Sequence, residues 1–234
     1  MNNVPAVSAG RFNMRHFLQP QVLPRAGGAA LISALACYPR LSLWLNRPAP
    51  VWHLELLIFL GCMVFWGFVF AWHTHYTGRP VLALKLEPGP WLAVTLTGII
   101  AATVFHLWFD SSLRARMPEE YPVDLKHWIA VVLFTLALNQ LFLVFAPLAW
   151  LMRLLKNRWL ATGLTALFGA GVLALKIQSL PTTIPPTLLA AMLAGRIVLG
   201  VLLVSFYLRG GVLLASWWTF LFETRLLLDL TGNP

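Results

Sequence analysis

Two adjacent amides, Asn139 and Gln140, interrupt an apolar stretch that reads LNQLFLVFAPLAWLMRL from residue 138 to residue 154. An amide side chain donates and accepts hydrogen bonds, but it is a poor metal ligand and cannot take a proton from water at neutral pH. On a helix the two side chains point about 100° apart, so both can face a polar interior. Taken alone, the pair predicts polar contacts between membrane helices, each worth about 0.6 kcal/mol.

Three charged residues, Arg196, Glu223 and Arg225, lie deep within other apolar stretches. Charges inside a membrane are costly, and they usually pair with one another or face a wet cavity. We therefore expect a buried polar cluster in which Glu223 pairs with Arg196 or with Arg225.

Acid–base or metal chemistry could also draw on His106 and on the acidic pair Glu119 and Glu120. Pro118 and Pro122 flank the acidic pair and predict that it lies in a solvated loop. The histidines of the His-Thr-His run at 73 to 75 stand two residues apart and do not share a helix face, so we expect them at the membrane interface.

The elements that must position these residues are membrane helices. The chain is 59% hydrophobic and 11% charged, and its apolar blocks are separated by short charged or Pro/Gly breaks. Only helices satisfy the backbone of such blocks in lipid. We predict an all-α fold, a polytopic helical bundle with about six transmembrane helices. The expected spans are 51–73, 90–109, 127–152, 158–180, 186–208 and 211–230.

The expected organisation has three parts. Residues 1–27 form a polar, basic tail, residues 28–50 an interfacial or membrane-crossing helix, and residues 51–234 a single membrane-embedded domain. Pro39 and Arg40 interrupt the first apolar segment, which favours a position on the membrane surface and leaves a seventh crossing as the alternative. The net charge of +9 comes from Lys and Arg between the apolar blocks, where they face lipid headgroups, so we exclude nucleic-acid binding.

Threading the six spans up and down predicts that most ionisable residues gather in one half of the membrane, which we call side A, where residue 51 enters. The residues in this half are His53, Glu55, His106, Asp110, His127, Lys176, Glu223, Arg225 and Asp229. The clustering suggests a polar pocket that opens to side A. The alternative for His53, Asp110, His127 and Asp229 is that they snorkel at interfacial helix ends.

From residue 138 onward the order of features resembles the CAAX-protease and bacteriocin-processing family, the intramembrane metalloproteases similar to type II CAAX prenyl endopeptidases. The features are a polar pair, the basic loop RLLKNR, the segment ALFGAGVLAL, a Pro-rich break, and VSFYLRGGVLLA at 204–215. The resemblance covers residues 51–230, with a core at 127–230. The family motifs are Glu-Glu-x-x-x-Arg, Phe-x-x-x-His and His-x-x-x-Asn on successive core helices.

Carried over onto this sequence, the family motifs lose the side chains that do chemistry. The glutamate pair falls on Asn139 and Gln140, and the arginine on Val144. The second motif keeps Phe168 and places Val172 at its histidine. The third motif places Phe220 at its histidine and Thr224 at its asparagine. Because a hydrolytic metal centre needs lone-pair ligands and a base, the resemblance implies a chain that cannot cleave peptides by the family mechanism.

The leading interpretation is a non-catalytic relative of these proteases, a pseudoprotease without metal or cofactor that acts by binding. Its expected partners are membrane lipid and another membrane protein: an active protease paralogue, a substrate transmembrane segment or a complex subunit. The expected location is the bacterial cytoplasmic membrane. One alternative is an active peptidase with relocated catalytic groups, drawn from Glu223, His106 and the pair Glu119 and Glu120. Another is a transporter or a cofactor-carrying membrane subunit.

Overall fold

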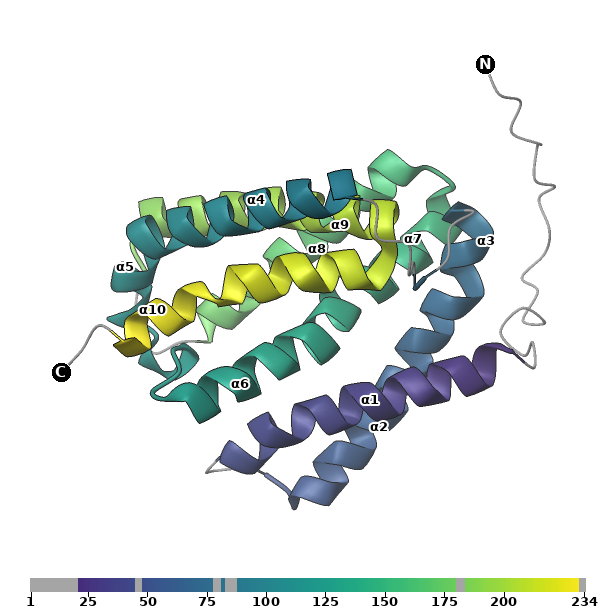
Figure 1. Ribbon diagram of the computed structural model, residues 1–234, viewed down its shortest axis with the longest axis horizontal. Helices are drawn as coiled ribbons and strands as arrows, with labels where there is room; N and C mark the ends of the chain where they lie inside the picture. The colour runs from purple at the N-terminus through teal and green to yellow at the C-terminus, as the bar shows by residue number, and fades with distance from the viewer. Residues whose placement is uncertain (1–20, 45–47, 78–80, 83–87, 180–183, 232–234) are drawn as a thin grey trace.

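The computed structural model describes residues 21–44, 48–77, 81–82, 88–179 and 184–231, and helices make up nearly all of these ranges (Figure 1). The elements are α1 (Val22–Leu43), α2 (Val51–Phe68), η2 (Val69–His73), α3 (Thr74–Thr77), α4 (Pro88–Phe105), η3 (His106–Asp110), α5 (Ser111–Arg114), η4 (Pro118–Glu120), α6 (Leu125–Phe134), η5 (Thr135–Asn139), η6 (Leu141–Phe145), α7 (Ala146–Leu155), α8 (Arg158–Gln178), α9 (Pro186–Glu223) and α10 (Arg225–Thr231).

The predicted all-α membrane bundle is confirmed. Five continuous stretches of helix in the described ranges are long and apolar enough to cross a membrane: Val51–His73, Pro88–Arg114, Leu125–Leu155, Arg158–Gln178 and Pro186–Leu228. The first four each contain one predicted span, apart from the last residues of 158–180. The fifth contains two, apart from the last two residues of 211–230, because its backbone leaves the helical conformation at Gly210 and Gly211.

The break in α9 is a tight turn that sends the chain back through the bundle, as Figure 1 shows. Gly211 has φ 69° and ψ −162°, and the Val212 N–H donates to the Val81 carbonyl at 3.0 Å. The rings of Phe206, before the turn, and Trp218, after it, lie 6.3 Å apart, and the two halves of α9 run antiparallel (Figure 1). The predicted separate spans 186–208 and 211–230 are therefore present.

Replacing Gly211 by alanine is expected to destabilise the protein by about 1–3 kcal/mol, because that combination of φ and ψ is open essentially to glycine alone. Denaturant unfolding in detergent micelles measures the loss. Gly163→Ala is the matched control, since it lies inside α8 with open space around the added Cβ, and it should be neutral or slightly stabilising. Equal effects of the two substitutions would contradict the assigned turn.

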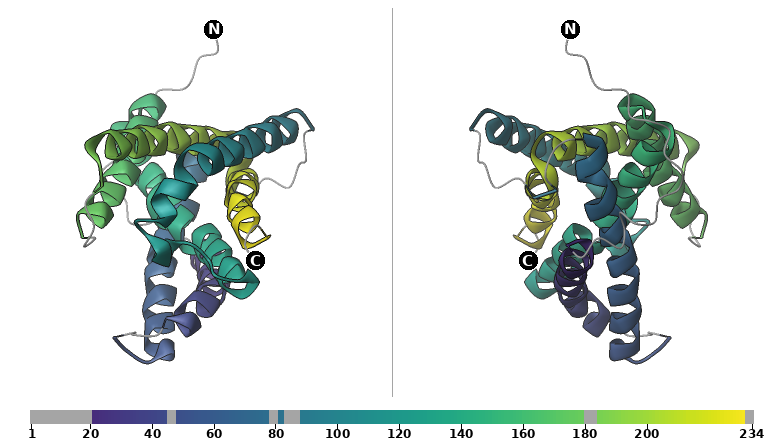
Figure 2. Two further views of the ribbon diagram at one scale, coloured as in Figure 1. Left: turned by 90° about the vertical axis from the view of Figure 1, so that its left-hand side faces the viewer. Right: turned by 90° about the vertical axis from the view of Figure 1, so that its right-hand side faces the viewer.

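Helix α1 packs antiparallel to α2, and Figure 2 shows the two side by side at one edge of the bundle. Val22, at the start of α1, lies in one cluster with Trp72, at the end of the first span, Val51–His73. The Trp66 indole N–H donates to Ser33 Oγ at 2.9 Å between them. The helix begins at Val22 rather than at residue 28, and Pro39 lies inside it. Helix α1 is not among the five stretches of the described chain that are long and apolar enough to cross a membrane, so its surface and membrane-crossing positions both stay predictions.

The bundle has two ends that differ in charge. At the basic end, α7 ends, α8 begins and α9 makes its turn, so Arg153, Lys156, Arg158 and Arg209 lie there. At the ion-pair end, which corresponds to side A, α5, the start of α6, the end of α8 and α10 come together. In Figure 1 the basic end is on the right and the ion-pair end on the left.

Candidate functional site

Gln140 joins the third span to the second half of α9. Its side chain is 3% exposed and lies where two π-helical turns, η5 and η6, meet. Its Nε2 donates to the Ala215 carbonyl at 3.4 Å, and its Oε1 accepts a hydrogen bond from Ser216 Oγ at 3.1 Å. Both ends of the carboxamide are thus used in helix packing, as the amide interpretation predicts, while Asn139 is half-buried beside it.

The other degenerate motif positions lie at different levels of the bundle. Val144 is buried in the main apolar core. Phe168 packs against Phe142 with ring centroids 5.8 Å apart, and Val172 follows it one turn later, half-buried.

Phe220 and Thr224 lie closer to the ion-pair end. Phe220 packs edge-on against Trp128, with ring centroids 6.3 Å apart, whereas Gln140 contacts the residues around 215. The Thr224 hydroxyl donates to the Leu221 carbonyl. Within the described ranges, no side-chain hydrogen bond or ring contact joins any two of the seven positions Asn139, Gln140, Val144, Phe168, Val172, Phe220 and Thr224.

A buried ion-pair cluster forms around Asp110, whose side chain is 2% exposed. Its carboxylate accepts a hydrogen bond from the Tyr121 hydroxyl at 2.9 Å, and Arg225 Nε lies 3.4 Å from both carboxylate oxygens. His106 Nδ1 lies 3.5 Å from Asp110 Oδ2 on the same helix. The residues come from three separate parts of the chain, so the cluster fastens α10 to the second span and its following loop.

Arg225 links this cluster to Glu223. Arg225 Nη1 lies 3.7 Å from Glu223 Oε2 and also donates to the Phe222 carbonyl at 2.9 Å. The expected pairing of Glu223 with Arg225 is confirmed. The Trp128 indole N–H donates to the Glu223 carbonyl at 3.0 Å, which ties the end of α9 to α6.

Arg196 stands beside the cluster without an ion pair to Glu223 within 4 Å. Its guanidinium covers Gly169 of α8, where an added Cβ would come within 3.3 Å of Nη2. The charge of Glu223 still acts on Arg196 at longer range. Two arginines therefore face two carboxylates, and the formal charges of Arg196, Arg225, Asp110 and Glu223 cancel.

The side-A clustering is confirmed for the residues that form these contacts. Lys176 Nζ lies 2.7 Å from Glu120 Oε2, which joins the end of α8 to the loop after the second span.

The interpretation of Asp110 as a snorkelling side chain is wrong, because its partners come from distant segments and enclose it. His127 does lie near a helix end, half-exposed and paired with Asp124. The side chain of Asp229 lies outside the described residues.

Asp124 is the N-cap of α6, and its pKa is lowered by hydrogen bonds from the His127 backbone N–H and from the His127 ring. A lowered carboxyl pKa contributes stability above the ordinary range of Asp, about pH 4, and loses it as the pH falls through the lowered value. We expect Asp124→Asn to be less stable than the original chain near neutral pH, and the difference to vanish on acidification. Thermal unfolding in detergent over a pH series measures this, and a difference that grows on acidification would contradict it.

The expected interfacial position of the His-Thr-His run is wrong for His73. Its ring is 2% exposed and lies 4.6 Å from the ring of Tyr207, which in turn stacks on Phe145. The first span, Val51–His73, ends in a π-helical turn, η2, which places His73 inside the bundle. His75 is exposed, as expected.

No group of three or more His, Cys, Asp or Glu side chains in the described part of the chain is arranged to hold a metal ion. Of the relocated groups considered for an active peptidase, the structure brings His106 and Glu223 into one cluster and leaves Glu119 exposed.

Comparison with protein-family models, curated proteins and solved structures gives no match for this chain.

Proposed function

We propose that this multi-pass membrane protein is a non-catalytic relative of the CAAX-type intramembrane proteases and acts by binding another membrane protein. The observation that supports this proposal best is the pair of hydrogen bonds that the Gln140 side chain makes to α9. Its carboxamide stands where the family has a metal-binding glutamate, and both of its ends bond to α9. A side chain engaged in this way contributes to helix packing and not to a hydrolytic centre.

The chemistry of the neighbouring motif positions supports the same proposal. Activating water on a metal needs ligands with available lone pairs and a group that accepts a proton. Val144, Val172 and Phe220 offer neither. The buried carboxylates of Asp110 and Glu223 are already engaged by Arg225, which disfavours their use as bases.

The short connections between the described helices indicate where a partner would bind. The loop from 115 to 124 is the longest described connection, and it packs against the bundle through Tyr121 and Glu120. A partner would therefore meet the helices inside the bilayer or their ends. The proposed partners are an active protease paralogue, the transmembrane segment of a substrate or a complex subunit, in the bacterial cytoplasmic membrane.

Cross-linking in intact membranes, followed by purification in mild detergent, tests the binding role. We expect one membrane protein to co-purify in fixed stoichiometry, and a chain that always elutes alone would overturn the role. Zinc analysis and a peptide-hydrolysis assay test the other half of the proposal. We expect no stoichiometric zinc and no hydrolysis, and metal-dependent hydrolysis by the purified chain would overturn it.

A second candidate, an active hydrolase with relocated groups, is favoured by the meeting of His106, Asp110 and Glu223 around Arg225. Histidine beside a buried carboxylate is an arrangement that general acid–base catalysis uses. It predicts a hydrolytic activity that is lost in both His106→Ala and Glu223→Ala. Retention of the measured activity in either variant would remove this candidate.

A further inference from the structure

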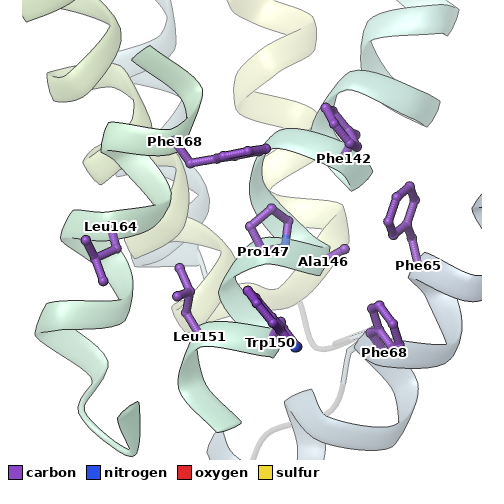
Figure 3. Close-up of a pocket in the computed structure, with 9 residues that line it drawn as sticks. All are labelled: Phe65, Phe68, Phe142, Ala146, Pro147, Trp150, Leu151, Leu164 and Phe168. Carbon is purple, nitrogen blue, oxygen red and sulfur yellow. The ribbon is translucent and has the colours of Figure 1, made fainter. Parts of the chain in front are cut away.

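An apolar groove of about 350 Å³ opens between α2, α7 and α8. Figure 3 shows its walls, which are built only from apolar side chains and include five aromatic residues: Phe65, Phe68, Phe142, Trp150 and Phe168. Trp150 is 49% exposed and Phe168 39% exposed, so the groove opens sideways toward the lipid.

The groove occupies one half of the membrane thickness. Phe168, at one end, stands ten residues after Arg158, or about 15 Å along α8. Trp150 and Leu151, at the other end, lie about one turn from the end of α7 at Leu155. Since the hydrocarbon core is about 30 Å thick, the groove covers the depth of a single leaflet at the basic end.

Basic side chains stand where this groove meets the membrane surface. The Arg153 guanidinium lies 4.3 Å from the ring of Trp72, which stacks at 4.7 Å on Phe68 in the groove wall. Lys156 and Arg158 follow, both exposed. No Asp or Glu occurs between residues 125 and 222, so this segment of the chain carries only positive charge where the groove meets the surface.

The two ends of the bundle differ in net charge. The described residues at the basic end include Arg25, Arg153, Lys156, Arg158 and Arg209, and no acidic residue among them. At the ion-pair end, basic and acidic residues occur together and pair. A membrane surface of the protein that carries Lys and Arg without acidic residues attracts anionic lipid headgroups.

We propose that the groove is a binding site for an anionic phospholipid of the leaflet at the basic end of the bundle. One acyl chain lies along the aromatic wall, and the phosphate stands beside Arg153, Lys156 and Arg158. The depth of one leaflet and the cations at headgroup level match a phospholipid, whereas a partner helix would extend across the whole membrane. The inference is independent of the proposed partner protein.

Native mass spectrometry of the purified chain tests the site, using phosphatidylglycerol and phosphatidylcholine with identical acyl chains. We expect the first bound phosphatidylglycerol to be retained in preference to phosphatidylcholine. Lys156→Asn with Arg158→Gln removes two cations, and asparagine suits the left-handed backbone of residue 156, which has φ 53°. Each cation near an anionic surface strengthens binding roughly fivefold, so this double substitution should reduce the preference for phosphatidylglycerol over phosphatidylcholine about 25-fold.

Two controls show whether the effects on lipid binding come from the groove itself, one for the cations and one for the apolar wall. Arg40→Gln with Lys126→Gln removes two cations near the opposite end and should leave the preference unchanged. Leu164→Trp fills the groove and should reduce retention of both lipids, while Leu167→Trp, on the exposed face of the same helix outside the groove, should not. Thermal unfolding shows which variants are folded and can be compared.

Three results would overturn the site. The first is equal retention of the two lipids by the original chain. The second is an unchanged preference after loss of Lys156 and Arg158. The third is a dimer or a protein complex that Leu164→Trp disrupts while lipid retention stays the same, which would assign the groove to a protein partner.

Discussion

Arg225→Met should lower the free energy of unfolding by about 3–5 kcal/mol, because it leaves the carboxylates of Asp110 and Glu223 without their ionic partner inside the bundle. Asp110 would keep the Tyr121 hydroxyl and the more distant His106 ring, which replace the guanidinium only in part. Unfolding in mixed detergent micelles, with increasing denaturing detergent, measures the loss. Adding Asp110→Asn to Arg225→Met should recover part of it, since that substitution removes the charge left unpaired.

The matched control for Arg225 is Lys176→Met. Lys176 and Glu120 form a shorter ion pair, at 2.7 Å, but their side chains are 47% and 39% exposed. Water screens such a pair, so its loss should cost under about 1 kcal/mol. Comparable losses in the two variants would show that the cluster around Asp110 is not effectively buried.

Double-mutant cycles can compare how strongly Arg225 and Arg196 are coupled to Glu223. The cycle of Glu223 with Arg225 should show a clear coupling energy, because their charged atoms lie 3.7 Å apart. The cycle of Glu223 with Arg196 should show a smaller one, because Arg196 packs over Gly169 and acts only at longer range. Absence of coupling in both cycles would remove Glu223 from the cluster.

The depth of residues in the membrane could be predicted from the sequence, because it follows from the length of each apolar block. That is why the six spans, and the shared membrane half of His106, Asp110, Glu223 and Arg225, are found as expected. The glycine pair at 210 and 211 also marked the boundary between two spans correctly, since a helix ends readily where glycine permits unusual backbone angles.

The direction in which each side chain points could not be predicted in the same way. The sequence leaves Asp110 between a polar pocket and an interfacial helix end, because its partner Arg225 is 115 positions away and approaches only when α10 packs beside the second span. His73 is turned into the core by a π-helical turn, which alters the helical phase locally and has no simple sequence signature. Partners of this kind depend on how the helices pack together.

The packing of the first helix against α2 could not be predicted from the sequence either. Pro39 and Arg40 weakened its apolar pattern and favoured a position on the surface. The structure packs it along α2, where Ser33 accepts a hydrogen bond from Trp66 and Cys37 and Cys62 are both buried. Proline near the end of a helix removes few hydrogen bonds, so it did not stop the segment from packing in the bundle.

Asn139→Glu combined with Gln140→Glu should destabilise the protein and restore no peptidase activity. Gln140 is 3% exposed, and its carboxamide donates to the Ala215 carbonyl. A glutamate there would lose that donor and place a negative charge beside a carbonyl oxygen, at a cost of about 3 kcal/mol for a charge inside a membrane. Unfolding in mixed micelles measures the loss, and a peptide-hydrolysis assay with added zinc measures activity.

Gln140→Met is the matched control for that double substitution, because it removes the hydrogen bonds without adding charge. It should cost only about 0.6 kcal/mol, the typical worth of a polar contact between membrane helices. The glutamate pair alone cannot rebuild a metal centre, since Val144, Val172 and Phe220 would still lack lone pairs and Phe220 lies away from Gln140, beside Trp128. Zinc-dependent hydrolysis in the double variant would contradict this geometry and would reinstate the metalloprotease mechanism for the chain.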